Sequence, residues 1–490
     1  MLAVVIIFFW RLLVQKEMDL AVASTAVAML LVIAFAVRSY YKPSRATCGV
    51  SRAHLTCDPG NSQSGYNHVV AVITFANSVK PETFKQRFIK AIVETESCFR
   101  TRMFFTRTGM EWRAAPSTWR PEDNFFVCGS VRRDSLEDMV AKILSGPTDL
   151  TKPCWELHFI ERVFDNSADD STSCIVLKYH HAMADGFTMI QRMVARIRPL
   201  DASKPITEMF PPTPPKHSRP SSLVGKIWRF VNSTMSILRM QPDIPGLFRS
   251  AKQRLPGESL NVSLSSQLNL LTIKEIARNM STGNSRMSVN DVITCIITRA
   301  FRLYSLNRGV SKPIDLTSVV WVSLNKDITV EEEWDNSNLG FAYVKLPLSV
   351  NSAKDCLREC HRRLSALKSS AEPLVINTTL KLLGSLPIAI GKTVSTYTAD
   401  VASVSMSNLI GPNSPVYWPV IDSDVTGSGL VDSVYFATSP PFRYGPLVSV
   451  ISYCGTFYLS LSARDSLLTK SDLDWISGEG ITLALNELNS

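Results

Sequence analysis

Two adjacent histidines and a nearby aspartate form the most informative chemical pattern in this chain, His180-His181-x-x-x-Asp185-Gly186. A neutral imidazole, with an ordinary pKa of about 6.5, can accept the proton that a weak nucleophile such as an alcohol loses as it attacks. We therefore expect His181 to act as a general base and Asp185 to fold back and brace the turn through a charged hydrogen bond. Gly186 is expected to allow a backbone geometry that a side chain would obstruct.

The sequence around this pattern predicts a strand, a turn and a helix. Residues 173–179 are rich in β-formers, and an apolar stripe follows Gly186 at helical spacing. The stripe consists of Phe187, Ile190, Met193, Val194 and Ile197. A turn after a strand can present the second histidine to a cleft.

The chain as a whole alternates strands and helices in two groups, which predicts an α/β fold of two subdomains. The first, residues 46–203, has a strand at residues 69–75 and a helix that begins at Pro81. The second spans residues 261–490. Its expected strands are 319–324, 341–348, 402–407, 433–438 and 448–462, the last a hairpin broken near Gly455, and its expected helices are 289–303, 353–367 and 374–382.

A linker, residues 204–260, is expected between the two subdomains. It starts with a proline-rich stretch that no regular element tolerates, and continues with apolar positions at helical spacing over residues 223–240. Residues 216–254 carry eight basic side chains and one acidic. This basic amphipathic helix suits a membrane surface or the mouth of a lipid channel, and equally a helix docked on the protein.

The N-terminus, residues 1–45, predicts a membrane anchor. Residues 20–37 are apolar and uncharged, and as a helix they would span about 27 Å, close to a bilayer core. The basic, aromatic tract that follows favours the cytosolic side, so we expect a catalytic domain that faces the cytosol, at the endoplasmic reticulum. A cleaved signal peptide and a buried helix are the alternatives. A shorter apolar run, residues 1–10, could be an interfacial helix or the first arm of a hairpin.

The composition of the chain predicts neither nucleic-acid binding nor a metal site. A net charge of +9 over 490 residues, without a dense basic run, does not predict nucleic-acid binding. Cys356, Cys360 and His361 lie close together on an expected helix, but a zinc site there would need a fourth ligand. We therefore interpret the cysteines as free thiols in a reducing compartment and expect no metal.

Further stretches make the chain similar to one family. They are Pro153-Cys154-Trp155-Glu156, Val289-Asn290-Asp291-Val292, Asn338-Leu339-Gly340 and Ser407-Asn408-Leu409-Ile410-Gly411-Pro412. With the histidine pattern, they resemble motifs of the wax ester synthase/diacylglycerol acyltransferase family, in the family's order. That family belongs to the coenzyme A-dependent acyltransferase superfamily, which shares the His-His-x-x-x-Asp-Gly motif.

The resemblance implies two chloramphenicol-acetyltransferase-like subdomains around a solvent tunnel. Acyl-coenzyme A would enter from one side as co-substrate and the acceptor alcohol from the other, without a cofactor. The thioester is already activated, so the alcohol can attack it directly. His181 would be the base, within a catalytic motif completed by His180, Asp185 and Gly186.

The resemblance also suggests roles for residues outside the motif. Asn290 would position substrate or polarise the reacting carbonyl, while Asp291 would bind substrate or cap a helix. Trp155 would line the substrate site or lie in the core, and Asn408 would lie near the tunnel. One departure is Asn325, which stands where the family commonly has the arginine that pairs with the motif aspartate.

The expected function is transfer of a fatty acyl group to a long-chain alcohol, which makes a wax ester, or to diacylglycerol, which makes triacylglycerol. Membrane lipid is the expected surrounding of both acceptors. A sterol, an amine or a small alcohol could replace the acceptor, and a non-catalytic lipid-binding protein could share the fold. The sequence indicates neither the acyl chain length nor the oligomeric state.

Overall fold

The computed structural model of the chain describes residues 54–55, 58–61, 63–106, 109–165, 172–210, 223–283, 285–324, 339–385, 388–398, 400–422 and 424–489. The predicted anchor at residues 1–45 and Asn325 lie outside these residues. Among the residues described, no helix combines the length and the apolar character that crossing a membrane requires. The anchor therefore stays a prediction.

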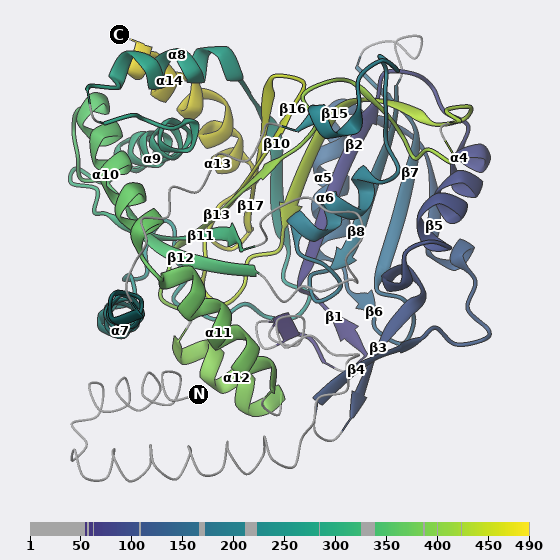
Figure 1. Cartoon of the computed structure of the whole chain (residues 1–490), viewed down its shortest axis with the longest axis horizontal. Coiled ribbons are helices and arrows are strands. Elements are labelled where there is room, and N and C mark those ends of the chain that lie inside the picture. Colours follow the sequence, from purple (N-terminus) through teal and green to yellow (C-terminus); the bar gives the residue numbers. More distant parts are fainter. Residues whose placement is uncertain are drawn as a thin grey trace.

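The first sheet has seven strands and is built mainly from the N-terminal half (Figure 1). Its order is β5 (Phe125–Arg132), β7 (Trp155–Phe164), β8 (Thr172–His180), β2 (His68–Phe75), β15 (Gly429–Thr438), β14 (Val416–Trp418) and β9 (Arg198–Pro199). Helices α4 (Pro81–Phe88) and α5 (Arg133–Ser145) contribute to its core, where Phe84 and Val140 are fully buried with Phe159. Two small sheets pair β1 (Ser64–Gly65) with β6 (Thr148–Asp149) and β3 (Thr101–Thr106) with β4 (Gly109–Ala114).

The second sheet has six strands from the C-terminal half. Its order is β10 (Leu260–Asn269), β17 (Thr456–Arg464), β16 (Leu447–Tyr453), β13 (Val404–Ile410), β11 (Leu316–Ser323) and β12 (Leu339–Leu346). Its core is shared with α8 (Leu270–Met280), α9 (Val289–Asn307), α10 (Ala353–Ser369), α13 (Lys470–Trp475) and α14 (Ile481–Asn489). These helices gather beside the sheet in Figure 1, while α11 (Glu372–Ser385) and α12 (Ile388–Thr398) lie below β12.

The two subdomains exchange strands, so a division of the chain at residue 261 does not describe the sheets. Strands β14 and β15 come late in the chain but belong to the first sheet, where β15 pairs with β2. Polar side chains of the second sheet then bond to β15. Tyr453 donates its hydroxyl to the Val431 carbonyl at 2.8 Å, and Ser462 donates to the Thr438 carbonyl at 2.6 Å. The exchange fastens the two halves together beside the site.

Most elements expected from local patterns are present. The hairpin predicted near Gly455 turns between β16 and β17, with positive φ angles of 49° at Cys454 and 77° at Gly455, as a tight primed turn requires. The predicted amphipathic helix is α7 (Leu223–Arg239). It buries Ile237 against Val375 of α11 and leaves Trp228 69% exposed, so one side of α7 is docked on the protein.

Candidate active site

The predicted strand, turn and helix are β8, a short turn and α6 (Gly186–Val194), and they place the two histidines differently. His180 ends β8 and is fully buried, with its Nε2 2.7 Å from Oδ2 of Asp58. The Ala182 backbone N–H donates to Nδ1 of His180 at 3.1 Å. Because Nδ1 is an acceptor, Nε2 carries the hydrogen that Asp58 accepts. His180 therefore holds the turn rather than reaching substrate.

Asp58 is the main residue of the site that the sequence analysis did not find. Its carboxylate also accepts the backbone N–H groups of Gly60 and Tyr66. Burial raises the pKa of Asp58, but the hydrogen bond from His180, with that from the Gly60 N–H, outweighs burial and brings the pKa down to about 2. Gly65 packs closely against the His180 ring, since a Cβ there would lie 2.6 Å from Cδ2 of that ring.

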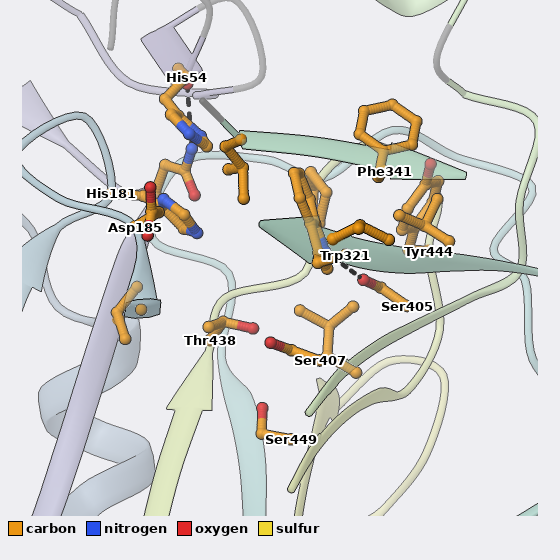
Figure 2. A pocket seen from close by; sticks show the side chains of 18 of the residues that line it. His54, His181, Asp185, Trp321, Phe341, Ser405, Ser407, Thr438, Tyr444 and Ser449 are labelled. Atoms are coloured by element: carbon orange, nitrogen blue, oxygen red, sulfur yellow. Dashed lines mark hydrogen bonds between the residues drawn. The ribbon is translucent and has the colours of Figure 1, made fainter. Parts of the chain in front are cut away.

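His181 lies on the wall of the main cavity. Its backbone N–H donates to the Asn67 carbonyl at 2.8 Å, and Asn67 donates its side-chain amide to the His54 carbonyl at 3.0 Å. The His54 ring stacks on the His181 ring, with centroids 4.1 Å apart and planes 20° apart. Figure 2 shows the His181 ring extending from the motif turn into the cavity, below His54.

The electrostatic setting keeps His181 uncharged. Burial lowers the pKa of its imidazole to about 4; its own backbone opposes this shift, and the neighbouring His180 adds to it. Its Nδ1 is buried and has no hydrogen-bond partner on the described residues. At neutral pH the ring is therefore free to accept a proton, and Nε2 is the atom available for it.

Asp185 and Gly186 start α6, as the strand–turn–helix pattern requires. Asp185 is the N-cap residue, and its carboxylate accepts the backbone N–H of Thr188 at 2.7 Å and the Thr188 hydroxyl at 3.0 Å. These two bonds run forward into α6, as those of an N-cap residue do, so the brace folded back onto the histidine turn that was expected of Asp185 stays a prediction. A Cβ at Gly186 would lie 2.8 Å from Cδ1 of Leu409 on β13, so a side chain there would displace the end of Leu409; the φ angle of Gly186 is not positive.

The cavity around His181 has a volume of about 180 Å³ and lies between the two sheets. Hydroxyls of Ser407, Thr438 and Ser449 are on its wall (Figure 2). The rest of the lining is largely apolar and aromatic, with Phe341 and Trp321; the Trp321 and His181 ring centroids are 6.3 Å apart, and the Trp321 indole N–H donates to Ser405 Oγ at 2.9 Å. A largely apolar cavity with a few polar groups suits a lipid that carries a reactive head.

A second cavity of about 130 Å³ has an almost entirely apolar lining. Met189 and Met193 of α6 line it. Gly186 and Leu409 line both cavities, so the contact between the motif turn and β13 stands at the boundary between them.

The other candidate residues lie at different distances from the cavity. Asn408 lines it and donates its side-chain amide to Oδ1 of Asn290 at 2.7 Å, so Asn290 is linked to the cavity through Asn408. Asp291 is fully buried in a capping box with Ser288 at the start of α9, which is the helix-cap interpretation. Trp155 is also fully buried, and its indole N–H donates to the Phe99 carbonyl at 2.9 Å, so it is a core residue.

The position expected to supply an arginine to Asp185, Asn325, lies outside the described residues. Within those residues, the side chains that could together hold a metal ion are Cys295, Cys356 and Cys360, and none of them lines the cavity. The cavity thus presents a base, hydroxyls and apolar walls, and this arrangement suits acid–base catalysis on a lipid substrate.

The fold defines a class first. The structure resembles that of the wax ester synthase/diacylglycerol acyltransferase from Marinobacter aquaeolei VT8, with a TM-score of 0.58, 18% identity, and coverage of 89% of this chain and 97% of that one. It also resembles the starter condensation domain of rhizomide synthetase in complex with C8-CoA, with a TM-score of 0.52, 11% identity, and coverage of 89% and 92%. The chain therefore has the two-subdomain α/β fold of condensation domains and related acyltransferases.

The sequence then defines the family. The profile of the wax ester synthase/diacylglycerol acyltransferase catalytic domain matches residues 58–294, and that of the family's C-terminal domain matches residues 334–473. The chain belongs to this family, as its motifs predicted. It is 26% identical over 321 residues to wax ester synthase/diacylglycerol acyltransferase 3 of Arabidopsis thaliana, an alignment that covers 57% of this chain and 62% of that protein.

Proposed function

We propose that this chain transfers a fatty acyl group from acyl-coenzyme A to a lipid alcohol, with His181 as the general base. The observation that carries the proposal is the uncharged imidazole of His181 on the wall of a cavity that is otherwise largely apolar. Family membership and the C8-CoA complex of a protein with the same fold support acyl-coenzyme A as the donor.

The reaction needs one proton acceptor and no covalent intermediate on the protein. The alcohol donates a hydrogen bond to Nε2 of His181, and its oxygen attacks the thioester carbonyl carbon as the ring takes the proton. The tetrahedral intermediate then collapses, the carbon–sulfur bond breaks, and the imidazolium returns the proton to the coenzyme A sulfur. The hydroxyls of Ser407, Thr438 and Ser449 are candidates to donate to the developing oxyanion.

The acceptor is proposed to be a long-chain alcohol, with diacylglycerol as a second acceptor. The apolar walls of both cavities favour alkyl chains, since burial of such chains releases water from apolar surface. The names of the family and of its relatives contain both activities, and support either product.

We also propose that the protein works at the cytosolic face of the endoplasmic reticulum, held by the anchor predicted at residues 1–45. Trp228 and Arg229 on the outer side of α7 are exposed, and an aromatic side chain beside a basic one suits a lipid headgroup region. Fractionation of cells that produce the full chain tests this: recovery in the soluble fraction would contradict it.

Acceptor profiling tests the proposed reaction. Microsomes that carry the chain are given labelled palmitoyl-coenzyme A with a long-chain alcohol, diacylglycerol, a sterol or a long-chain amine, and the products are separated by thin-layer chromatography. We expect labelled wax ester, triacylglycerol or both, above microsomes without the chain. Product only with the sterol or the amine would overturn the proposed acceptor, and no product with any acceptor would overturn the enzymatic function.

A further inference from the structure

Helices α9 and α10 bring three cysteine side chains together on the side of the second sheet. Cys295 comes from α9, while Cys356 and Cys360 lie one helical turn apart on α10. The three sulfur atoms all lie within 4.8 Å of one another, and all three side chains are at most 1% exposed. Cys356 and Cys360 are neighbours in the sequence pattern, whereas Cys295 is distant from them in the chain.

The spacing is close to that of a metal-bound thiolate triangle. A metal–sulfur bond of about 2.3 Å places three sulfur atoms of a trigonal site about 4 Å apart. Thiols already within 4.8 Å of one another need to approach by less than about 1 Å, which side-chain rotation can supply. The hydrogen bonds that the thiols make now are long, 3.7 Å from Cys295 to the Ala353 carbonyl and 4.0 Å from Cys356 to the Pro347 carbonyl, so giving them up costs little.

The three cysteine sulfurs favour a soft metal ion that accepts three ligands. His361, which the sequence placed beside Cys360, is engaged elsewhere: its Nδ1 lies 2.8 Å from Asp291 and its Nε2 3.0 Å from Ser285. Three sulfur ligands without a nitrogen or oxygen partner disfavour the four-coordinate geometry that zinc adopts in structural sites. Soft thiolate ligands suit both Cu(I) and zinc, and the three-coordinate set favours Cu(I) of the two.

Arginines near Cys356 can offset part of the charge of such a complex. Three thiolates and one Cu(I) leave two negative charges. Arg299, Arg302 and Arg363 all interact electrostatically with Cys356. Arg299 also pairs with Glu487 and Arg363 with Asp315, whereas Arg302 donates to the neutral oxygens of Leu348 and Asn351. Buried charge that is partnered in this way costs far less than isolated charge.

We propose that Cys295, Cys356 and Cys360 form a buried trigonal site for a soft, thiophilic metal ion, with Cu(I) as its ligand. On binding, the three thiols lose three protons to solvent and the ion forms three metal–sulfur bonds, without change of oxidation state. The ion joins α9 to α10. The site is independent of acyl transfer, because none of the three cysteines lines the cavity of His181.

Competition for Cu(I) under anaerobic conditions tests the site. The purified full chain is titrated against a coloured Cu(I) chelator of known affinity, alongside Cys295→Ala, Cys360→Ala and the matched control Cys174→Ala, which removes a buried thiol from β8. We expect one Cu(I) per chain for the natural protein and the control. Removing a cluster thiol should weaken binding by at least about 100-fold, since the loss of a mere outer-shell partner already costs about 10–100-fold. Cu(I) should raise the unfolding temperature of the natural protein and the control alone.

Two results would overturn the proposal. The first is that the chelator retains all Cu(I) in the presence of the natural chain. The second is that Cys295→Ala or Cys360→Ala binds Cu(I) as tightly as Cys174→Ala does. X-ray absorption of the Cu(I)-loaded natural chain needs no variant, so it decides the matter even where a substitution prevents folding. We expect three sulfur ligands, and two sulfur ligands or a nitrogen ligand would overturn the trigonal site.

Discussion

Substitution Asp58→Asn removes the buried pair that holds the first motif histidine. An asparagine keeps one oxygen for the backbone N–H groups of Gly60 and Tyr66. Its amide nitrogen would then face Nε2 of His180, so two N–H donors would meet at a separation that is now 2.7 Å. His180 could move its hydrogen to Nδ1 only by losing the bond from the Ala182 N–H. Either way one buried donor is left without an acceptor.

The expected loss in the free energy of unfolding follows from the pKa of Asp58. Burial alone would raise it, yet the bond from His180, with that from the Gly60 N–H, brings it from an ordinary 3.8 to about 2. This lowering of the pKa corresponds to roughly 2–3 kcal/mol, and both side chains are buried, so solvent does not screen the pair. Breaking a buried pair can cost more, so we expect Asp58→Asn to lower the free energy of unfolding by about 2–4 kcal/mol.

Urea unfolding of the purified chain measures this loss, with Asp134→Asn as a control because that carboxylate is exposed. A double-mutant cycle with His180→Gln separates the pair from the other bonds of Asp58. The turn that carries His181 should also shift, lowering kcat roughly 10-fold. A free energy of unfolding within about 0.5 kcal/mol of the natural chain, as for ordinary surface changes, would refute the reasoning.

Gly186→Val should destabilise the chain by about 1–3 kcal/mol, because its side chain would overlap Leu409, and Leu409→Ala in the same chain should restore part of the loss. His54→Ala should lower kcat roughly 10-fold by removing the ring stacked on His181, whereas His54→Phe should keep kcat within about 3-fold. The unfolding temperature should fall as the pH drops from about 6.5 towards 4. Burial lowers the pKa of His54, His68 and His181 in the fold, so the unfolded chain binds more protons in that window.

Each of these expectations has a direct check. Unfolding curves that show no recovery in the Leu409→Ala double variant would mean that Gly186 is needed for another reason. Equal kcat values for His54→Ala and His54→Phe would remove the stacking role of that ring. Calorimetry that finds a constant unfolding temperature from pH 7 to pH 4.5 would show that the buried histidines are not responsible for acid sensitivity.

The parts that could be predicted from sequence are those that depend on local patterns. β-rich runs and helical stripes gave β8, α6 and most other elements, and the motif drew attention to His181, which the structure places on the cavity wall. The role of His181 as a base stays a prediction, and Asp185 caps α6 through a residue three positions ahead.

The parts that sequence did not give depend on contacts between distant residues. Asp58 and His180 are 122 positions apart, and a single aspartate before a Pro-Gly turn carries no signal of such a partner. The crowding at position 186 arises from Leu409 of the other half, and the exchange of β15 arises from long-range pairing with β2. Local sequence patterns do not predict which distant segments come into contact.

The most direct test of the account is the dependence of the reaction on His181. Microsomes with the natural chain, His181→Ala or the control His158→Ala, whose ring stacks on Phe126 away from the cavity, receive palmitoyl-coenzyme A with and without a long-chain alcohol. We expect thiol release and ester formation that require the alcohol, and that His181→Ala lowers by about 10²–10⁴ while His158→Ala does not. Unchanged turnover in a folded His181→Ala chain would contradict the assignment of His181 as the base.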